Sequence, residues 1–355
     1  MKSKGFLGFI VLFLVFSCIM TSCSKEKTQQ DIESKGLPSS GGKTLEAILV
    51  IPDEVYKGEI KDSVGKYFMK ACPWLAQPEP LFDIVQMNPT GFFNSEMFTK
   101  HRNIIIIDIK AGNSNKLKQR LDYKSYPQAY FEFSVDNRDS LFALLQRYSD
   151  LIKKQFYNNE HRRVNSAFKK LENTDITRKL KSKFGFHLTL SEEFYLAVNE
   201  ENFVWLRKEP KDGSLGIMIY AMDYKNEEQF SQESIIALRD ELAKKYIPGP
   251  TRGSYMGTEH RFGFIRDTVQ IGEDKITAIE TRGLWRLFND YMGGPFVNYC
   301  FKDSQGQRLV MIDCFVYSYV DGYGQHSSNA IIISAPNASS ISITFSGEKK
   351  CLLPS

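Results

Sequence analysis

The stretch Asn103-Ile104-Ile105-Ile106-Ile107-Asp108-Ile109 is the strongest indication of a fold in this chain. Four consecutive isoleucines predict a strand that is covered on both faces, because a strand with one solvent-facing side would alternate apolar and polar residues. We therefore expect residues 103–109 to form a central strand of a sheet that helices flank.

Further elements surround this strand in the first half of the chain. Residues 45–51, 81–87 and 126–135 have the apolar, β-branched character of strands. Residues 52–70 predict a helix, since proline and acidic residues suit its first turn. A long helix is expected from residue 136 to about residue 181, because it begins at a good capping pair and carries apolar residues at helical spacing.

The second half contains more strands than helices. The predicted helix covers residues 231–246, with a serine at its start. The predicted strands cover residues 203–207, 215–222, 261–266, 275–285, 296–301 and 308–317. Because strands outnumber helices, the predicted fold class is α+β, with mixed or antiparallel sheets and flanking helices.

Two short blocks of the first half have counterparts in the second. Residues 49–56 resemble residues 188–195, and residues 99–102 resemble residues 258–261, in the same order. One interpretation is a tandem duplication, which predicts two related α+β units with equivalent His-Arg pairs. The other is chance similarity over short blocks, and the sequence leaves both open.

The amino terminus has the features of a secretory signal. Lys2 and Lys4 precede an apolar run at residues 6–16, which is too short to span a bilayer but suits a cleavable signal. The run ends in Met-Thr-Ser-Cys at residues 20–23, which resembles a bacterial lipobox. We therefore expect Cys23 to be acylated, the alternatives being an ordinary secreted protein or a membrane-anchored amino terminus.

Acylation at Cys23 would anchor the protein to a membrane, because two or three acyl chains hold a protein firmly on a bilayer. The residue after Cys23 is Ser24, whereas an aspartate at this position would resemble an inner-membrane retention signal. Outer-membrane sorting is therefore favoured. Residues 25–27 lack the acidic run that resembles a surface-export signal, so we expect a periplasm-facing protein in the cell envelope.

The predicted organisation has five segments. A signal peptide (1–22) and a flexible tether (23–43) precede two α+β units (44–182 and 183–320) and an atypical tail (321–355). No Asp, Glu, Lys or Arg occurs between residues 322 and 347, and this part of the tail forms either a closing hairpin or a poorly ordered end.

Composition excludes several classes of protein and partner. The chain has 355 residues, 42% of them hydrophobic and 13% aromatic, which excludes collagen-like, coiled-coil and wholly disordered proteins. The net charge is +4, and the signal peptide carries two of these charges. Because no clustered basic face is evident, we expect no nucleic-acid partner.

The cysteines give no evidence of a metal site or cofactor. Cys72, Cys300, Cys314 and Cys351 form no C-x-x-C pair and have no histidine at a spacing suited to zinc. Cys300 and Cys314 lie in neighbouring predicted strands, so they either face each other in a disulfide across a hairpin or remain buried thiols.

Several motifs resemble a known family: QPEPLFD at residues 77–83, HRNI at 101–104, and Trp285 followed by MGGPF at 292–296. In these motifs the chain is similar to an uncharacterised family of Bacteroidetes-type lipoproteins, labelled only as a domain of unknown function. The similarity runs from about residue 45 to residue 317. It implies lipidation, an envelope location and no assigned activity, whereas the uncharged tail departs from the charged helical end expected of the family.

Two His-Arg pairs are candidate anion-binding residues: His101 with Arg102, and His260 with Arg261. Placed at strand ends, arginine offers a planar fork to a carboxylate or phosphate. The alternative, which is favoured, is that each arginine pairs with a nearby acid and each histidine caps a strand.

A second candidate site lies on the strand predicted at residues 275–285. Arg282, Trp285 and Arg286 alternate with apolar residues, and Arg282 and Arg286 share a face, so Trp285 beside them could form a platform for a sugar or an acidic ligand. A core tryptophan with two solvated arginines is the favoured alternative. Residues 293–295, Gly-Gly-Pro, predict a tight turn.

Three Asp-Ser/Thr triplets resemble the acceptor pattern for O-glycosylation of exported Bacteroidetes-type proteins. Their acceptor residues are Ser63, Ser140 and Thr268. The alternative is structural, because Asp followed by Ser or Thr is also common at turns and helix starts.

No catalytic motif is convincing in this sequence, because neither G-x-S-x-G nor H-E-x-x-H occurs and no P-loop has the required spacing. We therefore expect a non-catalytic envelope lipoprotein that binds a small ligand or another envelope protein. The alternative is an envelope hydrolase with a non-standard site built from His101, Arg102, His260 or Asp83.

Overall fold

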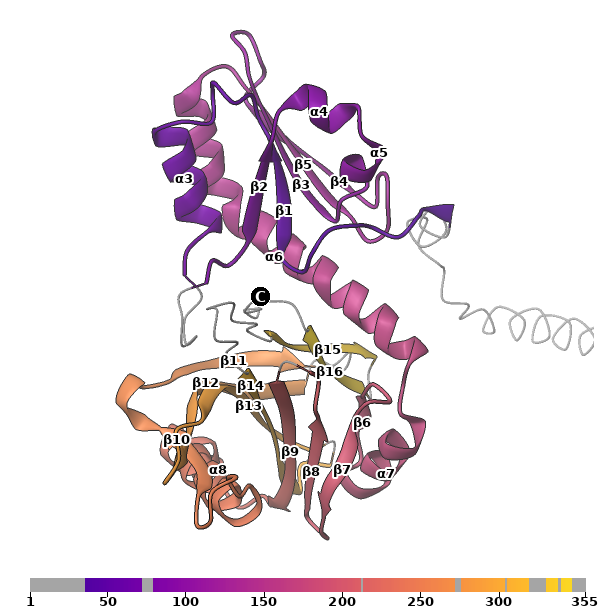
Figure 1. Cartoon of the computed structure of the whole chain (residues 1–355), viewed down its shortest axis with the longest axis vertical. Helices are drawn as coiled ribbons and strands as arrows, with labels where there is room; N and C mark the ends of the chain where they lie inside the picture. Colours follow the sequence, from indigo (N-terminus) through magenta and orange to yellow (C-terminus); the bar gives the residue numbers. More distant parts are fainter. Residues whose placement is uncertain are drawn as a thin grey trace, which may run out of the picture. The chain divides into compact units, whose positions relative to one another are not determined.

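A computed structural model describes residues 36–71, 79–211, 213–271, 276–303, 305–318, 330–337 and 340–346 (Figure 1). The predicted signal peptide, the proposed acylation site Cys23 and two further cysteines, Cys72 and Cys351, lie outside these ranges. Two large sheets organise most of the rest, a third of three strands joins His187–Thr189 to the tail, and we call residues 38–170 the first unit and residues 174–318 the second unit.

The first unit is built on a five-stranded mixed sheet with the strand order β2-β1-β3-β5-β4. Strands β1 (Glu46–Val50), β2 (Asp83–Met87), β3 (Asn103–Ile109) and β5 (Ala129–Val135) run parallel to one another. The edge strand β4 (Lys116–Leu121) is antiparallel to β5. The predicted central strand is confirmed, since β3 has neighbours on both sides and its first five residues are buried.

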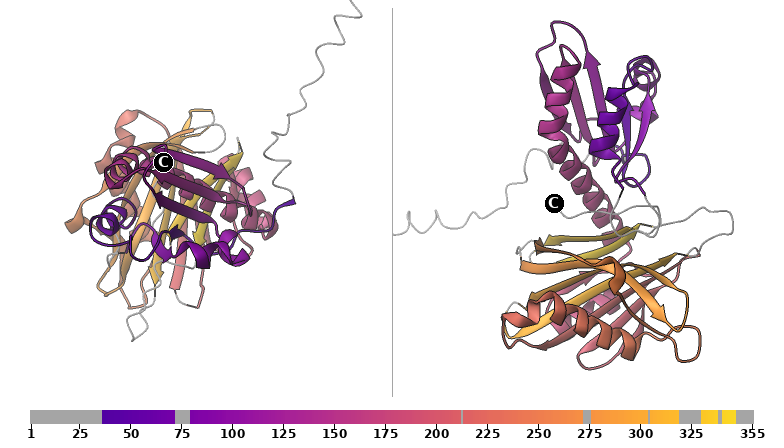
Figure 2. Two further views of the ribbon diagram at one scale, coloured as in Figure 1. Left: turned by 90° about the horizontal axis from the view of Figure 1, so that it is seen from above. Right: turned by 90° about the vertical axis from the view of Figure 1, so that its left-hand side faces the viewer.

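Helices cover both faces of this sheet, as the isoleucine run predicts. Helices α3 (Glu59–Phe68) and α6 (Arg138–Lys170) lie against each other and cover one face (Figures 1 and 2). Two short helices, α4 (Pro89–Phe93) and α5 (Glu96–Thr99), lie on the other face and close a smaller core over β1 and β3 with Phe92. The helical cover is therefore unequal on the two faces.

The second unit is built on an antiparallel, curled eight-stranded sheet. Its order is β10-β12-β13-β14-β9-β8-β7, and β11 also pairs with β12. The strands are β7 (Tyr195–Asn199), β8 (Phe203–Lys208), β9 (Gly213–Asp223), β10 (Tyr255–Glu259), β11 (Ile265–Ile271), β12 (Ile276–Phe288), β13 (Gly293–Lys302) and β14 (Arg308–Ser318).

Each face of this second sheet has its own core. Helix α7 (Thr174–Phe184) contributes Ile176, Leu180 and Phe184 to one core. The boundary predicted from the sequence, at residue 182, would place most of this helix in the preceding unit. Helix α8 (Gln232–Tyr246) packs on the opposite face, and Ser231 caps it by accepting a hydrogen bond from the Ser234 N–H. The sheet is therefore a middle layer between two helices.

The uncharged tail forms strands in its described part. Strands β15 (Ala330–Asn337) and β16 (Ser340–Ser346) pair as an antiparallel hairpin, and β16 runs parallel to β6 (His187–Thr189). This arrangement agrees with the closing hairpin, one of the two alternatives that the sequence leaves open.

The predicted α+β class with mixed and antiparallel sheets is confirmed, but the two units are not copies of one fold. The first sheet is mainly parallel with five strands, whereas the second is antiparallel with eight. The short sequence matches therefore do not reflect a shared topology, and the expectation of equivalent His-Arg pairs is wrong.

Of the two alternatives for Cys300 and Cys314, buried thiols are confirmed and a disulfide across a hairpin is not. Cys300 lies opposite Met311 in the strand register, and Cys314 lies opposite Val297. Cys300 belongs to the core under α8, whereas Cys314 belongs to the core under α7. The two buried thiols point to opposite faces of the sheet and remain free.

None of the helices in the described ranges is both long and apolar enough to cross a membrane.

Candidate functional site

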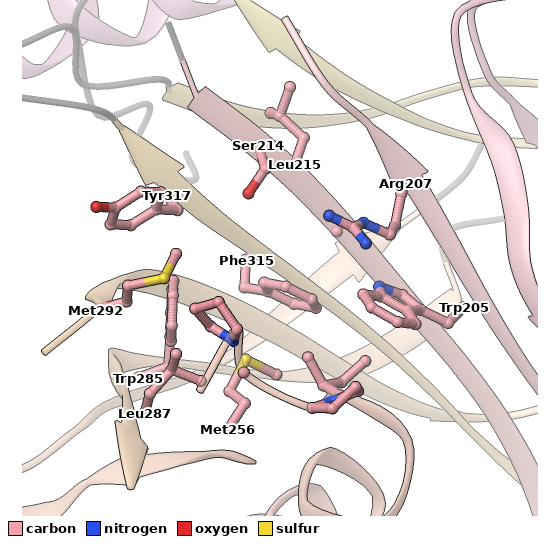
Figure 3. Close-up of a pocket in the computed structure, with 15 residues that line it drawn as sticks. Trp205, Arg207, Ser214, Leu215, Met256, Trp285, Leu287, Met292, Phe315 and Tyr317 are labelled. Atoms are coloured by element: carbon pink, nitrogen blue, oxygen red, sulfur yellow. The ribbon is translucent and has the colours of Figure 1, made fainter. Parts of the chain in front are cut away.

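A cavity of about 520 Å³ opens on the α8-covered face of the second sheet. Aromatic side chains from different strands form much of its wall, with one arginine among them (Figure 3). The lining residues that determine its chemistry are Trp205, Arg207, Trp285 and Phe315.

Strand register explains how these side chains meet. Arg207 on β8 and Phe315 on β14 both lie opposite Gly216 on the intervening strand β9, so the three residues form one row across the sheet. A side chain at Gly216 would collide with the Phe315 ring. The glycine therefore lets Phe315 lie over the sheet and leaves room in the same row.

Trp285 forms another wall of the cavity and is fixed by a glycine of the neighbouring strand. Its indole Nε1–H donates a hydrogen bond of 3.0 Å to the Val316 carbonyl oxygen. A Cβ at Gly294 would collide with that oxygen and lie 3.0 Å from Nε1. The prediction of a tight turn at residues 293–295 is wrong, because these residues lie in β13 and pair with β12.

Trp205 and Arg207 provide the polar character of the cavity. Trp205 is 8% exposed, and its indole N–H has no acceptor among the described residues. The Arg207 guanidinium carbon lies 4.9 Å from the centroid of the Trp205 ring, and Arg207 also pairs with Glu209 outside the cavity wall. A hydrogen-bond donor and a cation thus lie beside each other in a mainly apolar space.

The described lining residues include no Asp, Glu, His, Lys or Cys. Such a lining can stack on rings, bury apolar groups and donate hydrogen bonds to an anion, but it offers no pair of groups for general acid–base or nucleophilic catalysis. No cluster of three or more His, Cys, Asp or Glu side chains suited to a metal ion occurs within the described ranges.

A second cavity of about 550 Å³ lies on the same face of the sheet and includes Cys300 in its wall. Its charged lining groups already have partners: Lys302 pairs with Glu227 at 2.7 Å, and Arg266 donates to the Phe230 carbonyl oxygen at 2.8 Å. Burial raises the pKa of the Cys300 thiol, which keeps it protonated and unreactive. The aromatic cavity is therefore the better candidate site.

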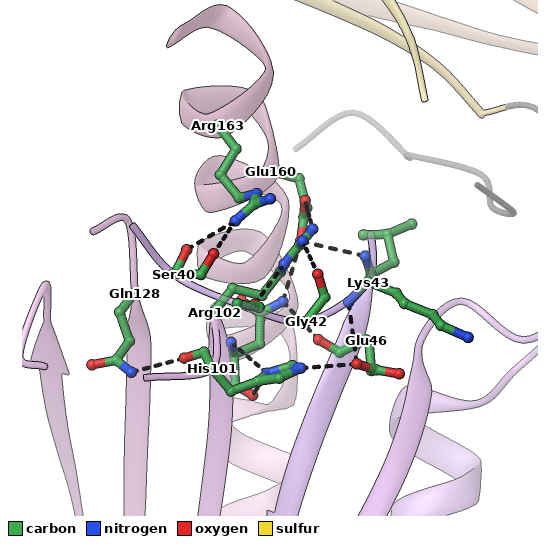
Figure 4. Close-up of polar contacts among 12 residues, drawn as sticks. Ser40, Gly42, Lys43, Glu46, His101, Arg102, Gln128, Glu160 and Arg163 are labelled. Atoms are coloured by element: carbon green, nitrogen blue, oxygen red, sulfur yellow. Dashed lines mark hydrogen bonds and ion pairs between the residues drawn. The ribbon is translucent and has the colours of Figure 1, made fainter. Parts of the chain in front are cut away.

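His101 and Arg102 lie in the first unit, at the amino end of β3, and are buried (Figure 4). Arg102 Nη1 is 2.8 Å from Glu160 Oε2, and His101 Nε2 is 3.0 Å from Glu46 Oε1. Burial lowers the pKa of His101, against the opposing effect of its hydrogen bond to Glu46. Each residue therefore pairs with a nearby acid at the start of β3. This is the structural role that the favoured alternative predicts.

His260 and Arg261 lie in a single turn of 3-10 helix, η3 (His260–Phe262), after β10. His260 Nε2 is 3.2 Å from Asp240 Oδ2, and Arg261 Nη2 is 2.6 Å from Glu259 Oε2. The Arg261 guanidinium lowers the pKa of Glu259 to about 2. Each member of this pair therefore has an acidic partner, and neither lines either cavity.

Arg282, Trp285 and Arg286 do not form a platform, and the favoured alternative of a core tryptophan is confirmed for Trp285. Trp285 points into the core under α8, whereas the two arginines, an odd number of positions away, point to the other face of β12. Arg282 Nε is 2.6 Å from Glu280 Oε1, and the Tyr299 hydroxyl donates to the same carboxylate at 2.5 Å. Only Trp285 belongs to the cavity.

The residues of the hydrolase alternative are not brought together in either cavity. His101, Arg102 and Asp83 belong to the first sheet, and His260 belongs to the second unit. None of them lines either cavity.

The three candidate glycosylation residues lie in regular secondary structure. Ser63 is in α3, Ser140 is in the first turn of α6 with its N–H bound to Asn137, and Thr268 is in β11. Their modification stays a prediction.

Three lining residues, Trp205, Arg207 and Phe315, were not predicted from the sequence. Trp205 and Arg207 are two positions apart on a strand, so their shared face was visible in the sequence. Their proximity to Phe315 depends on the order β8-β9-β14, which joins strands far apart in the chain.

Two family models match the chain, one in each unit. Residues 40–169 match the model of a domain of unknown function (DUF8532), and residues 173–319 match the model of another (DUF4837). No curated protein and no solved structure matches the chain. Two regions that cover most of the two units are therefore similar to two uncharacterised domain families.

Proposed function

We propose that the protein is an envelope lipoprotein, anchored by acylated Cys23, whose second unit binds a small amphipathic anion without catalysing a reaction. The aromatic cavity carries this proposal, since Arg207 is the one charged group among its described lining residues. An outer-membrane, periplasm-facing location follows from residues 20–27, and no nucleic-acid partner is proposed.

The lining defines the chemistry of the ligand. Trp205, Trp285 and Phe315 suit an aromatic or aliphatic body, because rings bury large apolar areas and stack on flat groups. Arg207 and the indole N–H of Trp205 suit a carboxylate, sulfonate or phosphate at one end of that body. The volume of about 520 Å³ fits a small-molecule ligand.

Two fluorescent probes test this chemistry: anilinonaphthalene sulfonate, an amphipathic anion, and the neutral N-phenylnaphthylamine. Both are titrated into the mature chain, from residue 23, with Cys23→Ser. We expect tighter saturable binding of the sulfonate, and Arg207→Gln should weaken it about tenfold with little effect on the neutral probe. Trp205→Phe keeps a ring but removes the N–H donor, so it should weaken the sulfonate severalfold.

Arg261→Gln is the matched control, because Arg261 also pairs with a glutamate but lies outside the cavity. Equal effects of Arg207→Gln and Arg261→Gln on sulfonate binding, or an absence of saturable binding, would contradict the proposed site.

The anchor has its own test. In cells that express the full chain, radiolabelled palmitate should be incorporated into the protein, and Cys23→Ala should abolish labelling and release the protein from the membrane fraction. An unlabelled wild-type chain, or full membrane retention of the Cys23→Ala variant, would refute the anchor without affecting the cavity.

A further inference from the structure

One face of the first sheet is left partly open. The helices α4 and α5, with five and four residues, cover this face over β1 and β3. Tyr130 of β5 belongs to the same face, and beyond it lies the edge strand β4. The exposed side of this region is therefore formed by the two short helices, β4 and the turn that follows β4.

Strand β4 presents a row of basic side chains on this face. Lys118 lies opposite Glu132 and Arg120 lies opposite Tyr130, and directly opposed residues of antiparallel strands share a face. Lys116, two positions before Lys118, is on the same side, whereas Leu117 and Leu121 point to the core under α3 and α6. Lys116 and Lys118 are exposed and have no salt-bridge partner among the described residues.

Aromatic and apolar side chains accompany these charges. The ring centroids of Tyr123 and Tyr130 are 5.5 Å apart. Arg120 Cζ and Nζ of the exposed Lys124 lie 4.8 and 5.0 Å from the Tyr123 centroid. On the short helices, Phe93 is 58% exposed and Met97 is 69% exposed. Exposed apolar side chains on the same face as unpaired lysines are typical of surfaces that enter the interface of an anionic bilayer.

The chain joins the first unit beside this surface. The Tyr126 N–H donates to the Pro38 carbonyl oxygen at 2.9 Å, and the Ser40 N–H donates to the Tyr126 carbonyl oxygen at 3.0 Å. Tyr126 is two residues from Lys124. About 15 residues separate Cys23 from Pro38, so an anchor at Cys23 lies within roughly 50 Å of this entry point.

We propose that this basic-aromatic face, formed by Phe93, Met97, Lys116, Lys118, Tyr123 and Lys124, docks on the anionic phospholipid headgroups of the membrane that holds the anchor. The lysines attract the headgroups, and Phe93 and Met97 enter the boundary between headgroups and acyl chains. The anchor, on which the proximity argument rests, supplies a high local concentration, and the face determines which side of the first unit meets the bilayer.

Vesicle sedimentation tests the face without the anchor. The protein is the mature chain with Cys23→Ser, and the vesicles contain seven parts phosphatidylcholine to three parts phosphatidylglycerol, with pure phosphatidylcholine for comparison. We expect binding to the anionic vesicles that weakens as salt is raised. Each lysine near an anionic surface contributes about fivefold, so Lys116→Gln/Lys118→Gln/Lys124→Gln should lower partitioning by roughly 100-fold.

The matched control removes three exposed lysines from the opposite side of the same sheet. Lys57→Gln/Lys61→Gln/Lys66→Gln, in α3 and the turn before it, makes the same change in net charge. It should reduce partitioning much less than Lys116→Gln/Lys118→Gln/Lys124→Gln. Far-UV circular dichroism of both variants should match that of the parent protein.

A second pair of variants tests the apolar contribution. Phe93→Ala/Met97→Ala should weaken binding about tenfold or more and leave its salt dependence unchanged, whereas Tyr291→Ala, a fully exposed residue of the second unit, should have no effect. Absence of binding to anionic vesicles, or equal losses for the two lysine triples, would overturn the docking face. Palmitate labelling at Cys23 would then still stand.

Discussion

The buried ion pair between Arg102 and Glu160 predicts a large loss of stability when its acid is neutralised. Arg102 is 3% exposed and Glu160 is 1% exposed, so water does not compensate either charge. Glu160 also accepts hydrogen bonds from the Leu45 N–H at 3.3 Å and from Asn103 Nδ2 at 3.5 Å. Glu160→Gln keeps the shape of the side chain and leaves the Arg102 charge buried without its counter-charge.

The size of the loss follows from this burial. Removing one partner of a buried pair costs about 3–5 kcal/mol, because the remaining charge stays desolvated. Hydrogen bonds from Arg102 to the Gly41 and Gly42 carbonyl oxygens remain, which favours the lower end of that range. The double variant Arg102→Met/Glu160→Met removes both charges, so we expect it to lose about 1–2 kcal/mol and to be more stable than Glu160→Gln.

Urea unfolding followed by far-UV circular dichroism measures these differences. In a Trp74→Phe background, the remaining tryptophans, Trp205 and Trp285, both belong to the second unit, so their fluorescence reports whether its core stays intact. A loss below about 1 kcal/mol for Glu160→Gln, or a double variant less stable than the single one, would refute the reasoning. Sulfonate-probe binding should be unchanged in Glu160→Gln below the unfolding transition, because Glu160 does not line the cavity.

A histidine with a lowered pKa, two glycines and two buried thiols can be tested separately. Burial lowers the pKa of His161 to about 4, so protonation of His161 opposes folding. The free energy of unfolding should therefore fall by roughly 2 kcal/mol from pH 6.5 to 4, and by less in His161→Gln. Equal dependence of the free energy of unfolding on pH in the two proteins would contradict this. Gly294→Ala should cost about 2 kcal/mol or more, whereas Gly65→Ala, in the open surface of α3, should stabilise by about 0.5–1 kcal/mol, both by urea unfolding. In a background without the other cysteines, Cys300 and Cys314 should react with a thiol reagent only in urea, and reaction in the native state would show that these thiols are accessible.

The elements that the sequence predicted well are those with an unambiguous apolar pattern. The four isoleucines of β3 predict a buried strand, and the serine cap of α8 predicts the start of a helix; both predictions are confirmed. Strand β4 was missed because its basic residues alternate with leucines on a sheet edge, where one side faces solvent. Strand β10 was missed because it is short and has a glycine at its centre.

The candidate site was less accessible to sequence reasoning. The favoured interpretation of Trp285 as a core residue was correct, but Arg282, expected to be solvated, lies on the opposite face of the strand and pairs with buried Glu280. The structural alternative for Arg102 was correct, although its partner Glu160 lies 58 positions away, on a different element. Long-range partners of this kind depend on topology, which local patterns do not determine.

The opposite orientations of Cys300 and Cys314 have a consequence for how the protein reaches its folded state. Burial raises the pKa of each thiol, so both are inert once the sheet is covered on its two faces. Before that point, an oxidising compartment can convert either thiol into a non-native disulfide, which would leave one strand of the sheet unable to take its place. In an exported chain, the two cores must therefore close before these thiols are oxidised. The yield of oxidative folding should rise when both cysteines are replaced by alanine or serine.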